Sequence, residues 1–169
     1  MMNVLVVDGY NVIGAWDELQ KVQEQDFGQA RDHLIESMAD YQAYTGYRVV
    51  IVFDAYYVPG IQSNQKSYRV DVIYTKENET ADECIERLVK DYKNVSNQVY
   101  VATSDYMEHR ITFGRGALRK SARELLIEVK DIEKEIEKKI KLHKKEQPHS
   151  KIILNQEVLE TFEKWRRGR

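Results

Sequence analysis

The chain has 169 residues, 42% hydrophobic and 32% charged, with one cysteine and a formal net charge of −2. This length suits a single domain over residues 1–169, and one cysteine excludes a disulfide framework and favours a reducing compartment. No apolar stretch approaches the roughly 20 residues that cross a bilayer, and the short N-terminal apolar run cannot form a signal-peptide core. We therefore expect a cytoplasmic protein with no membrane partner.

The charge is unevenly distributed along the chain. Residues 1–113 hold 10 Lys and Arg against 18 Asp and Glu, a net charge of −8, whereas residues 114–169 hold 16 against 10, a net charge of +6. An acidic half that could hold a metal and a basic half that could meet phosphates would suit a metal-dependent nuclease. An ordinary solvated surface with uneven charge explains the same numbers equally well.

The N-terminal part predicts one strand and one long helix. Residues 4–7 are four consecutive aliphatic residues, which favours a strand buried on both faces. The run stops at Asp8, and residues 9–17 are expected to form a loop. Residues 26–44 then carry apolar side chains at spacings of three and four, which predicts a helix, and Gly46 is placed to end it.

The middle of the chain repeats the strand-then-helix pattern. Residues 48–53 form a second aliphatic run that again ends at an acid, Asp54. A long loop over residues 55–66 leads to a third predicted strand, residues 68–74. Thr80 and Glu83 have the capping-box spacing, so a helix should follow and extend to about residue 92.

A fourth strand over residues 99–102 is followed by Thr103, Ser104 and Asp105. The apolar spacing then predicts a helix over residues 118–146, about 40 Å long at ~1.5 Å per residue, and a final helix over residues 156–167. Strands that alternate with helices predict an α/β sandwich with a mainly parallel central sheet, extended by a basic C-terminal helical region.

Four acids fall at related places in this pattern. Asp8, Asp54 and Asp105 each follow an aliphatic strand, and Asp82 lies in the first turn of a helix. The carboxyl ends of parallel strands share one sheet edge, where clustered carboxylates repel one another unless a cation lies between them. Mg²⁺ takes such oxygen ligands and supports phosphodiester hydrolysis. Each acid also has a structural explanation, as a turn former, a cap or a partner of a helix dipole.

These segments resemble the NYN-domain branch of the PIN-like nucleases. The similarity lies in Asp8-Gly9-Tyr10-Asn11, Phe53-Asp54-Ala55, Thr80-Ala81-Asp82-Glu83 and Thr103-Ser104-Asp105. Residues 116–125 (GALRKSAREL) are similar to the YacP-like subgroup of bacterial endoribonucleases. The resemblance covers residues 3 to about 130, and it implies a three-layer α/β/α sandwich.

The resemblance also implies an activity and a set of site residues. It implies an endoribonuclease that uses Mg²⁺ or Mn²⁺, takes part in mRNA decay and has the ribosome as a partner. Asp8, Asp82 and Asp105 correspond to the catalytic metal ligands. Asn11, Asp54 and Ser104 are implied as supporting residues. Many PIN domains carry glutamate where this chain has Asp82, which leaves one or two metal ions possible.

Two basic groups are predicted to contact RNA. The first group follows the acids and could hold phosphates: Arg115, Arg119, Lys120 and Arg123. The second group is predicted to dock on a large RNA surface such as the ribosome: Lys138, Lys139, Lys141, Lys144, Lys145, Arg166 and Arg167. Ordinary surface charge and a solvated helix face are the respective alternatives. Tyr56 and Tyr57 could stack on bases or could be common loop tyrosines.

Three other functions compete with the nuclease hypothesis. A non-catalytic RNA or ribosome adaptor could keep the same fold, although retention of the four acids argues against it. A phosphatase of the haloacid dehalogenase type needs a second acid two residues after the first, where this chain has Tyr10. A DNA-acting flap nuclease carries helical additions for which this chain is too short.

Overall fold

The computed structural model describes residues 2–57, 69–94, 96–104, 116–146, 156–166 and 168. Its centre is a five-stranded parallel sheet with the strand order β3-β2-β1-β4-β5. The strands are β1 (Met2–Asp8), β2 (Arg48–Phe53), β3 (Asp71–Tyr74), β4 (Asn97–Ala102) and β5 (Leu118–Lys120). The helices are α1 (Gly9–Ala15), α2 (Asp17–Gln25), α3 (Phe27–Thr45), the short 3-10 helix η1 (Ala55–Tyr57), α4 (Ala81–Tyr92), α6 (Ala122–Glu146) and α8 (Gln156–Arg166).

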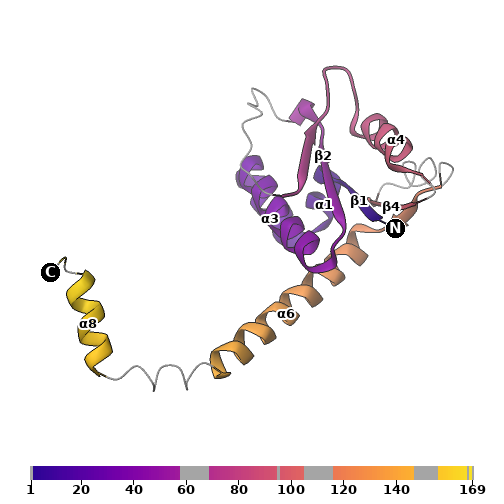
Figure 1. Ribbon diagram of the computed structural model, residues 1–169. Helices are drawn as coiled ribbons and strands as arrows, with labels where there is room; N and C mark the ends of the chain where they lie inside the picture. Colours follow the sequence, from indigo (N-terminus) through magenta and orange to yellow (C-terminus); the bar gives the residue numbers. More distant parts are fainter. Residues whose placement is uncertain are drawn as a thin grey trace. The chain divides into compact units, whose positions relative to one another are not determined.

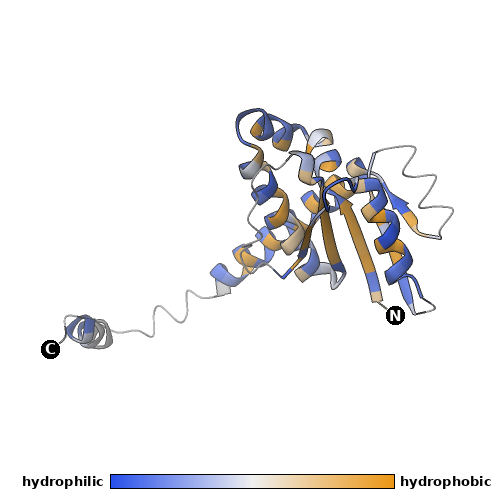
Figure 2. Ribbon diagram, turned by 90° about the horizontal axis from the view of Figure 1, so that it is seen from above, coloured by the Kyte–Doolittle hydropathy of each residue, from blue (hydrophilic) through white to orange (hydrophobic). Residues whose placement is uncertain are grey.

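Helices cover both faces of the sheet, as the three-layer prediction requires (Figure 1). On one face, the buried residues of α4 pack against alternate residues of β1, β2 and β4, including Val4, Val6 and Val101. The residues in between, such as Leu5 and Ile51, are also fully buried and point toward the face covered by α1 and α3. Because both faces are covered, the central strands are strongly hydrophobic along most of their length (Figure 2).

Predicted helix boundaries at α3 and α4 are confirmed by their capping contacts. The Asp26 carboxylate accepts a hydrogen bond from the Gln29 backbone N–H at 3.2 Å, and the Thr80 hydroxyl accepts one from Glu83 at 3.1 Å. Gly46 ends α3 with a φ of 78°, a left-handed conformation that glycine adopts without the cost of a Cβ.

Three predicted boundaries differ from the structure. The predicted loop over residues 9–17 is wrong, because helix α1 begins directly after Asp8. The predicted start of the long helix at Leu118 is also wrong. Leu118–Lys120 forms the edge strand β5 instead, which pairs in parallel with β4, and the helix begins at Ala122. The predicted start of the third strand at residue 68 is wrong as well, because β3 begins at Asp71 and the described residues Arg69 and Val70 form a bend before it.

Contacts divide the chain into two compact units, residues 1–130 and 131–169. The first unit contains the whole sheet. The second contains the later part of α6 and all of α8. One nuclease domain over residues 1–169 therefore stays a prediction. No helix within the described ranges is long and apolar enough to span a membrane.

Candidate active site at the carboxyl edge of the sheet

The strand order of the sheet reverses between β1 and β4. Chain connections leave β1 toward β2 on one side, while β4 lies on the other, so the order reverses at this point. In open parallel sheets, ligands bind outside the carboxyl ends of the strands where such a reversal occurs. Asp8 is the last residue of β1, and Thr103 directly follows β4. Because Val7 and Ala102 are register partners, Asp8 and Thr103 lie side by side at this reversal.

The Asp8 carboxylate is nearly enclosed by its surroundings. The residue is 8% exposed, and the Thr103 hydroxyl donates a hydrogen bond to Asp8 Oδ2 at 3.3 Å. Thr103 itself is fully buried. A buried carboxylate is costly unless polar or cationic groups compensate its charge. This position therefore has the property that a metal-binding or catalytic acid needs.

Asn11 and Ser104 meet beside Asp8. The Asn11 side-chain oxygen accepts two hydrogen bonds from Ser104, one from the backbone N–H at 2.7 Å and one from the hydroxyl at 2.9 Å. These bonds join the first turn of α1 to the end of β4. The structure thus brings together three of the residues predicted for the site, namely Asp8, Asn11 and Ser104.

Gly9 explains why a helix can begin directly after Asp8. A Cβ at this position would lie 2.4 Å from Phe53 Cε1 and 2.9 Å from the Val52 carbonyl oxygen. Only glycine therefore lets the chain turn this closely against β2. The turn also brings the Tyr10 ring to 5.1 Å from the Phe53 ring.

Asp82 approaches the same edge from α4. It is the second residue of that helix, it is exposed, and the helix begins after the loop that leaves the carboxyl end of β3. Since α4 connects the carboxyl end of β3 to the amino end of the parallel strand β4, its first turn lies at the edge that carries Asp8. Asp105, the third predicted ligand, lies outside the described residues. Within the described ranges, no group of three or more His, Cys, Asp or Glu residues forms a metal site.

The hydrogen bond described for Asp54 is to the loop that directly follows it, and not to Asp8. The Asp54 carboxylate accepts a hydrogen bond from the Tyr56 backbone N–H at 2.9 Å. The Thr75 hydroxyl accepts another from the Ala55 N–H at 2.9 Å, so the short helix η1 is fixed on two sides. Tyr56 on this turn is 85% exposed. The geometry therefore agrees with the structural explanation of Asp54, in which it caps the following loop.

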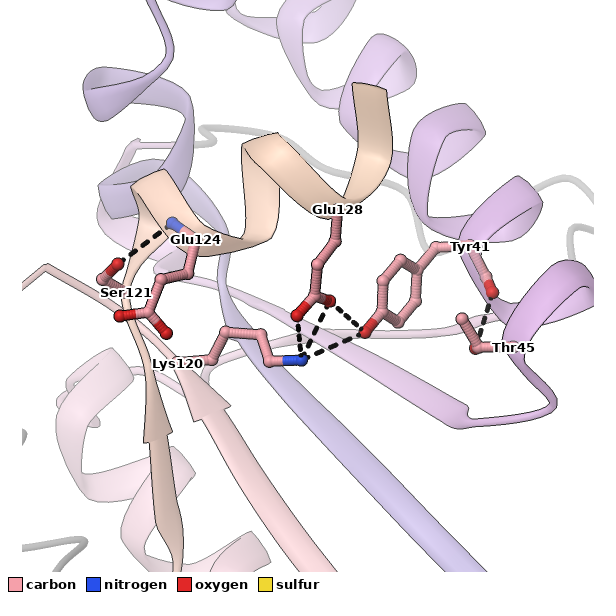
Figure 3. A network of polar contacts seen from close by, with 6 residues as sticks. All are labelled: Tyr41, Thr45, Lys120, Ser121, Glu124 and Glu128. Atoms are coloured by element: carbon pink, nitrogen blue, oxygen red, sulfur yellow. Dashed lines mark hydrogen bonds and ion pairs between the residues drawn. The ribbon is translucent and has the colours of Figure 1, made fainter. Parts of the chain in front are cut away.

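Lys120 is a correction to the predicted RNA-binding group. It is only 9% exposed, and its Nζ lies 2.8 and 2.9 Å from the two Glu128 carboxylate oxygens and 3.3 Å from the Tyr41 hydroxyl (Figure 3). The same ammonium lies 5.2 to 5.9 Å from the ring centres of Tyr41, Tyr47 and Tyr100. A cation enclosed in this way cannot reach a phosphate.

The remaining basic residues of that group differ from Lys120 in exposure. Arg119 and Arg123 are exposed, so they remain available for phosphate contacts. Arg115 lies outside the described residues. In the second unit, the five α6 lysines predicted for docking (Lys138, Lys139, Lys141, Lys144 and Lys145) and Arg166 are exposed, and Arg167 lies outside the described residues. Lys138 pairs with Glu135 at 3.6 Å.

Sequence reasoning gave no role to Thr103, Tyr10 or Arg31. The position of Thr103, directly after a strand and before the predicted Ser104-Asp105 pair, was a usable signal. Arg31 had no such signal in the sequence, because it lies within a helical pattern. Only the folded structure brings it close to the site. Its Nη1 donates a hydrogen bond to the Tyr10 hydroxyl at 2.9 Å.

Comparison with known proteins decides the family. The model of the YacP-like NYN domain matches residues 5–167. The chain belongs to the YacP-like NYN domain family. A member of this family, the "Uncharacterized protein YacP" of Bacillus subtilis strain 168, is 56% identical over 167 residues, which is 99% of this chain and 98% of that protein.

Two solved structures agree with this assignment. The crystal structure of Rae1 (YacP) from Bacillus subtilis matches with a TM-score of 0.81 and 56% identity, covering 99% of this chain and 96% of that chain. A tryptophan-to-leucine mutant of the same protein matches with a TM-score of 0.78 and 52% identity, with the same coverage of both chains. The PIN-like α/β fold is thereby confirmed, and the NYN domain family is nuclease-like.

Proposed function

We propose that this NYN-domain protein is a divalent-metal-dependent endoribonuclease that cuts mRNA in association with the translating ribosome. The observation that carries the proposal is the buried Asp8 carboxylate at the strand-order reversal, with Thr103 and Ser104 directly after the neighbouring strand β4. Its relation to YacP supports an RNase-type activity. A cytoplasmic location would agree with such a substrate.

The predicted ligands suit a hard divalent cation. NYN and PIN-like nucleases typically use divalent metals, and carboxylate oxygens are the ligands that Mg²⁺ and Mn²⁺ prefer. The Thr103 hydroxyl beside Asp8 is neutral, so it supports the carboxylate without cancelling its charge. Asp8, Asp82 and Asp105 would hold the ion. When bound, it would supply an activated water and stabilise charge on the phosphoryl group.

The protein's own residues would position this set. Asn11 holds Ser104 through two hydrogen bonds, which fixes the chain just before Asp105 relative to Asp8. Thr103 orients one oxygen of the Asp8 carboxylate through its hydroxyl. These contacts would keep the acids in place before RNA arrives.

The first test is cleavage of single-stranded RNA with Mg²⁺ or Mn²⁺, with and without EDTA. Cleavage should require the ion and should leave a 5′-phosphate and a 3′-hydroxyl, because attack by a metal-activated water produces those ends. Asp8→Asn and Asp82→Asn should each abolish cleavage. In metal-free buffer their melting temperatures should hold or rise by a few degrees, since the loss of a charge relieves repulsion.

Specific results would contradict the proposal. Full activity in either variant would disprove the site, and a 2′,3′-cyclic phosphate product would disprove the hydrolytic mechanism. RNA or ribosome binding without any cleavage, under every metal condition, would favour the non-catalytic adaptor.

The ribosome part of the proposal is supported by the exposed lysines of α6. Phosphate contacts release counterions, so binding should weaken steeply as salt rises. A variant with glutamine at Lys138, Lys139, Lys141, Lys144 and Lys145 should sediment less with ribosomes and should show a smaller salt dependence. Cosedimentation equal to that of the parent across a salt series would disprove this docking role.

A further inference from the structure

Arg31 lies at the sheet edge that carries Asp8. Helix α3 begins at Phe27 and is followed by β2, so it runs back toward the amino ends of the strands and has its first turns at the carboxyl edge. The Phe27 ring centre lies 5.9 Å from that of Tyr10, and the Arg31 guanidinium donates to the Tyr10 hydroxyl at 2.9 Å. Tyr10 is only two residues after Asp8.

A second tyrosine borders the same guanidinium. Tyr74 is the last residue of β3, and its ring lies 5.8 Å from that of Phe53, which also contacts Tyr10. Burial raises the pKa of Tyr74, and the adjacent Arg31 charge partly opposes this rise. The ordinary pKa of a tyrosine hydroxyl is about 10, so both tyrosines are neutral at neutral pH and neither cancels the charge of Arg31.

Arg31 differs from other arginines of this unit in its partners. Arg48 is paired with Asp71 at 3.0 Å, and Arg87 is paired with Glu79. Within the described part of the chain, no carboxylate lies within 4.0 Å of the Arg31 guanidinium. The residue is partly exposed, and its hydrogen bond to Tyr10 occupies only part of its five-donor fork. A guanidinium with this geometry matches a phosphate, which it can bind through two parallel hydrogen bonds.

We propose that Arg31 binds a backbone phosphate of the RNA strand beside the acid site, and that the Tyr10 and Tyr74 hydroxyls hold its guanidinium in position. The inference rests on the proposed endoribonuclease function and deepens it. The acidic edge would otherwise repel RNA, so a cation there lets the strand approach the carboxylates. Arg31 is thus a substrate-binding residue and not a metal ligand.

The test compares Arg31→Gln with Arg48→Gln, a matched control at the amino end of β2. Binding of a short single-stranded RNA is measured in EDTA, which prevents cleavage, over a series of salt concentrations. Arg31→Gln should weaken binding about tenfold or more, as expected for loss of a hydrogen-bonded charge. The slope of log K against log salt should fall in magnitude by about 0.7, the value for one lost phosphate contact on a single strand. Arg48→Gln should change neither quantity.

Two further variants separate binding from a purely structural role. Arg31→Lys keeps the charge but loses the fork, so it should retain the salt slope and recover part of the affinity. Tyr10→Phe removes the supporting hydroxyl, so it should weaken binding less than Arg31→Gln while keeping the slope. In cleavage assays with Mg²⁺ or Mn²⁺, Arg31→Gln should raise KM about tenfold or more with kcat within about twofold.

The outcomes distinguish the two proposals. If the parent cleaves RNA and Arg31→Gln keeps its affinity and salt slope, the Arg31 inference is wrong and the nuclease function stands. If the parent cleaves no RNA under any metal condition, the proposed function fails first. If Arg31→Gln does not fold, Arg31→Lys decides, because parental affinity in that variant shows that the fork contributes nothing.

Discussion

Two adjacent cations of β5, Arg119 and Lys120, should respond in opposite ways to removal of their charge. Arg119 is exposed, whereas the Lys120 side chain is 11% exposed and bonded to Glu128 and Tyr41. We expect Lys120→Met to lower the stability of the protein and leave RNA binding unchanged. Arg119→Gln should instead weaken RNA binding and leave the stability of the protein unchanged.

The size of the stability loss for Lys120→Met depends on the contacts that Glu128 keeps after the substitution. Without Lys120, Glu128 keeps the 2.7 Å hydrogen bond from the Tyr41 hydroxyl, and 39% of its side chain is exposed to water. The lost charged hydrogen bonds, discounted for this exposure, give a cost of about 2 kcal/mol. For a protein of this size the melting temperature should fall by about 4 to 8 °C.

Removing the other partner should cost more. Glu128→Gln leaves the Lys120 ammonium enclosed among three tyrosine rings with no carboxylate, and an uncompensated buried charge costs about 3 kcal/mol or more. In thermal or urea unfolding, Glu128→Gln should therefore be less stable than Lys120→Met, and both should be less stable than the parent. RNA binding over a salt series supplies the second measurement. A Lys120→Met variant with parental stability and a reduced salt slope would refute the reasoning and return Lys120 to the phosphate-binding group.

Three further predictions follow from other parts of the first unit. Gly9→Ala should destabilise the protein by about 3 kcal/mol in urea unfolding, because its Cβ would lie 2.9 Å from the Val52 backbone oxygen, which cannot move aside as a side chain can; parental stability would contradict this. Stability should fall as pH rises above about 10, the ordinary tyrosine pKa, by up to about 1.4 kcal/mol per pH unit for each tyrosine whose pKa burial raises. The sign follows because the unfolded chain then binds fewer protons than the folded one. These tyrosines are Tyr10, Tyr41, Tyr47 and Tyr74. Unfolding free energies measured between pH 8 and 11 check this, and a flat profile would disprove it. Tyr56→Ala should weaken single-stranded RNA binding about fivefold or more if the exposed ring stacks on a base, with no change in salt slope, whereas Tyr44→Ala, at the far end of α3, should have no effect.

The sequence predicted the sheet well because its strands carry their own signal. Each of β1 and β2 contains an uninterrupted aliphatic run, residues 4–7 and 49–52, a pattern typical of a strand covered on both faces. The position of Asp8 at the end of β1 followed from the same pattern. The alternation of strands and helices then fixed the parallel topology.

Two of the wrong boundaries, the start of α1 and the start of the long helix, depend on contacts that no local pattern encodes. Gly9 is a poor helix former, and α1 begins there because the space beside Phe53 admits no side chain. Leu118–Lys120 has helix-favouring residues, yet it forms a strand because the free edge of β4 pairs with it. Lys120 was misjudged for the same reason. Its burial depends on Tyr41 and Glu128, which lie 79 and 8 residues away along the chain.

The acids that follow β1 and β2 looked equivalent in sequence, but the register of the strands separates them. Asp8 pairs with Val52, so Asp54 lies two residues farther along β2 than the level of Asp8. At about 3.3 Å per residue, this places the Asp54 backbone about 6 to 7 Å beyond that level. There its carboxylate holds the turn that carries Tyr56, through the 2.9 Å bond to the Tyr56 N–H. Asp54 would then support the site by presenting an aromatic ring to RNA, while Asp8, level with Thr103 on β4, would hold the metal. Asp54→Asn, which keeps an oxygen acceptor for that bond, should accordingly preserve far more activity than Asp8→Asn.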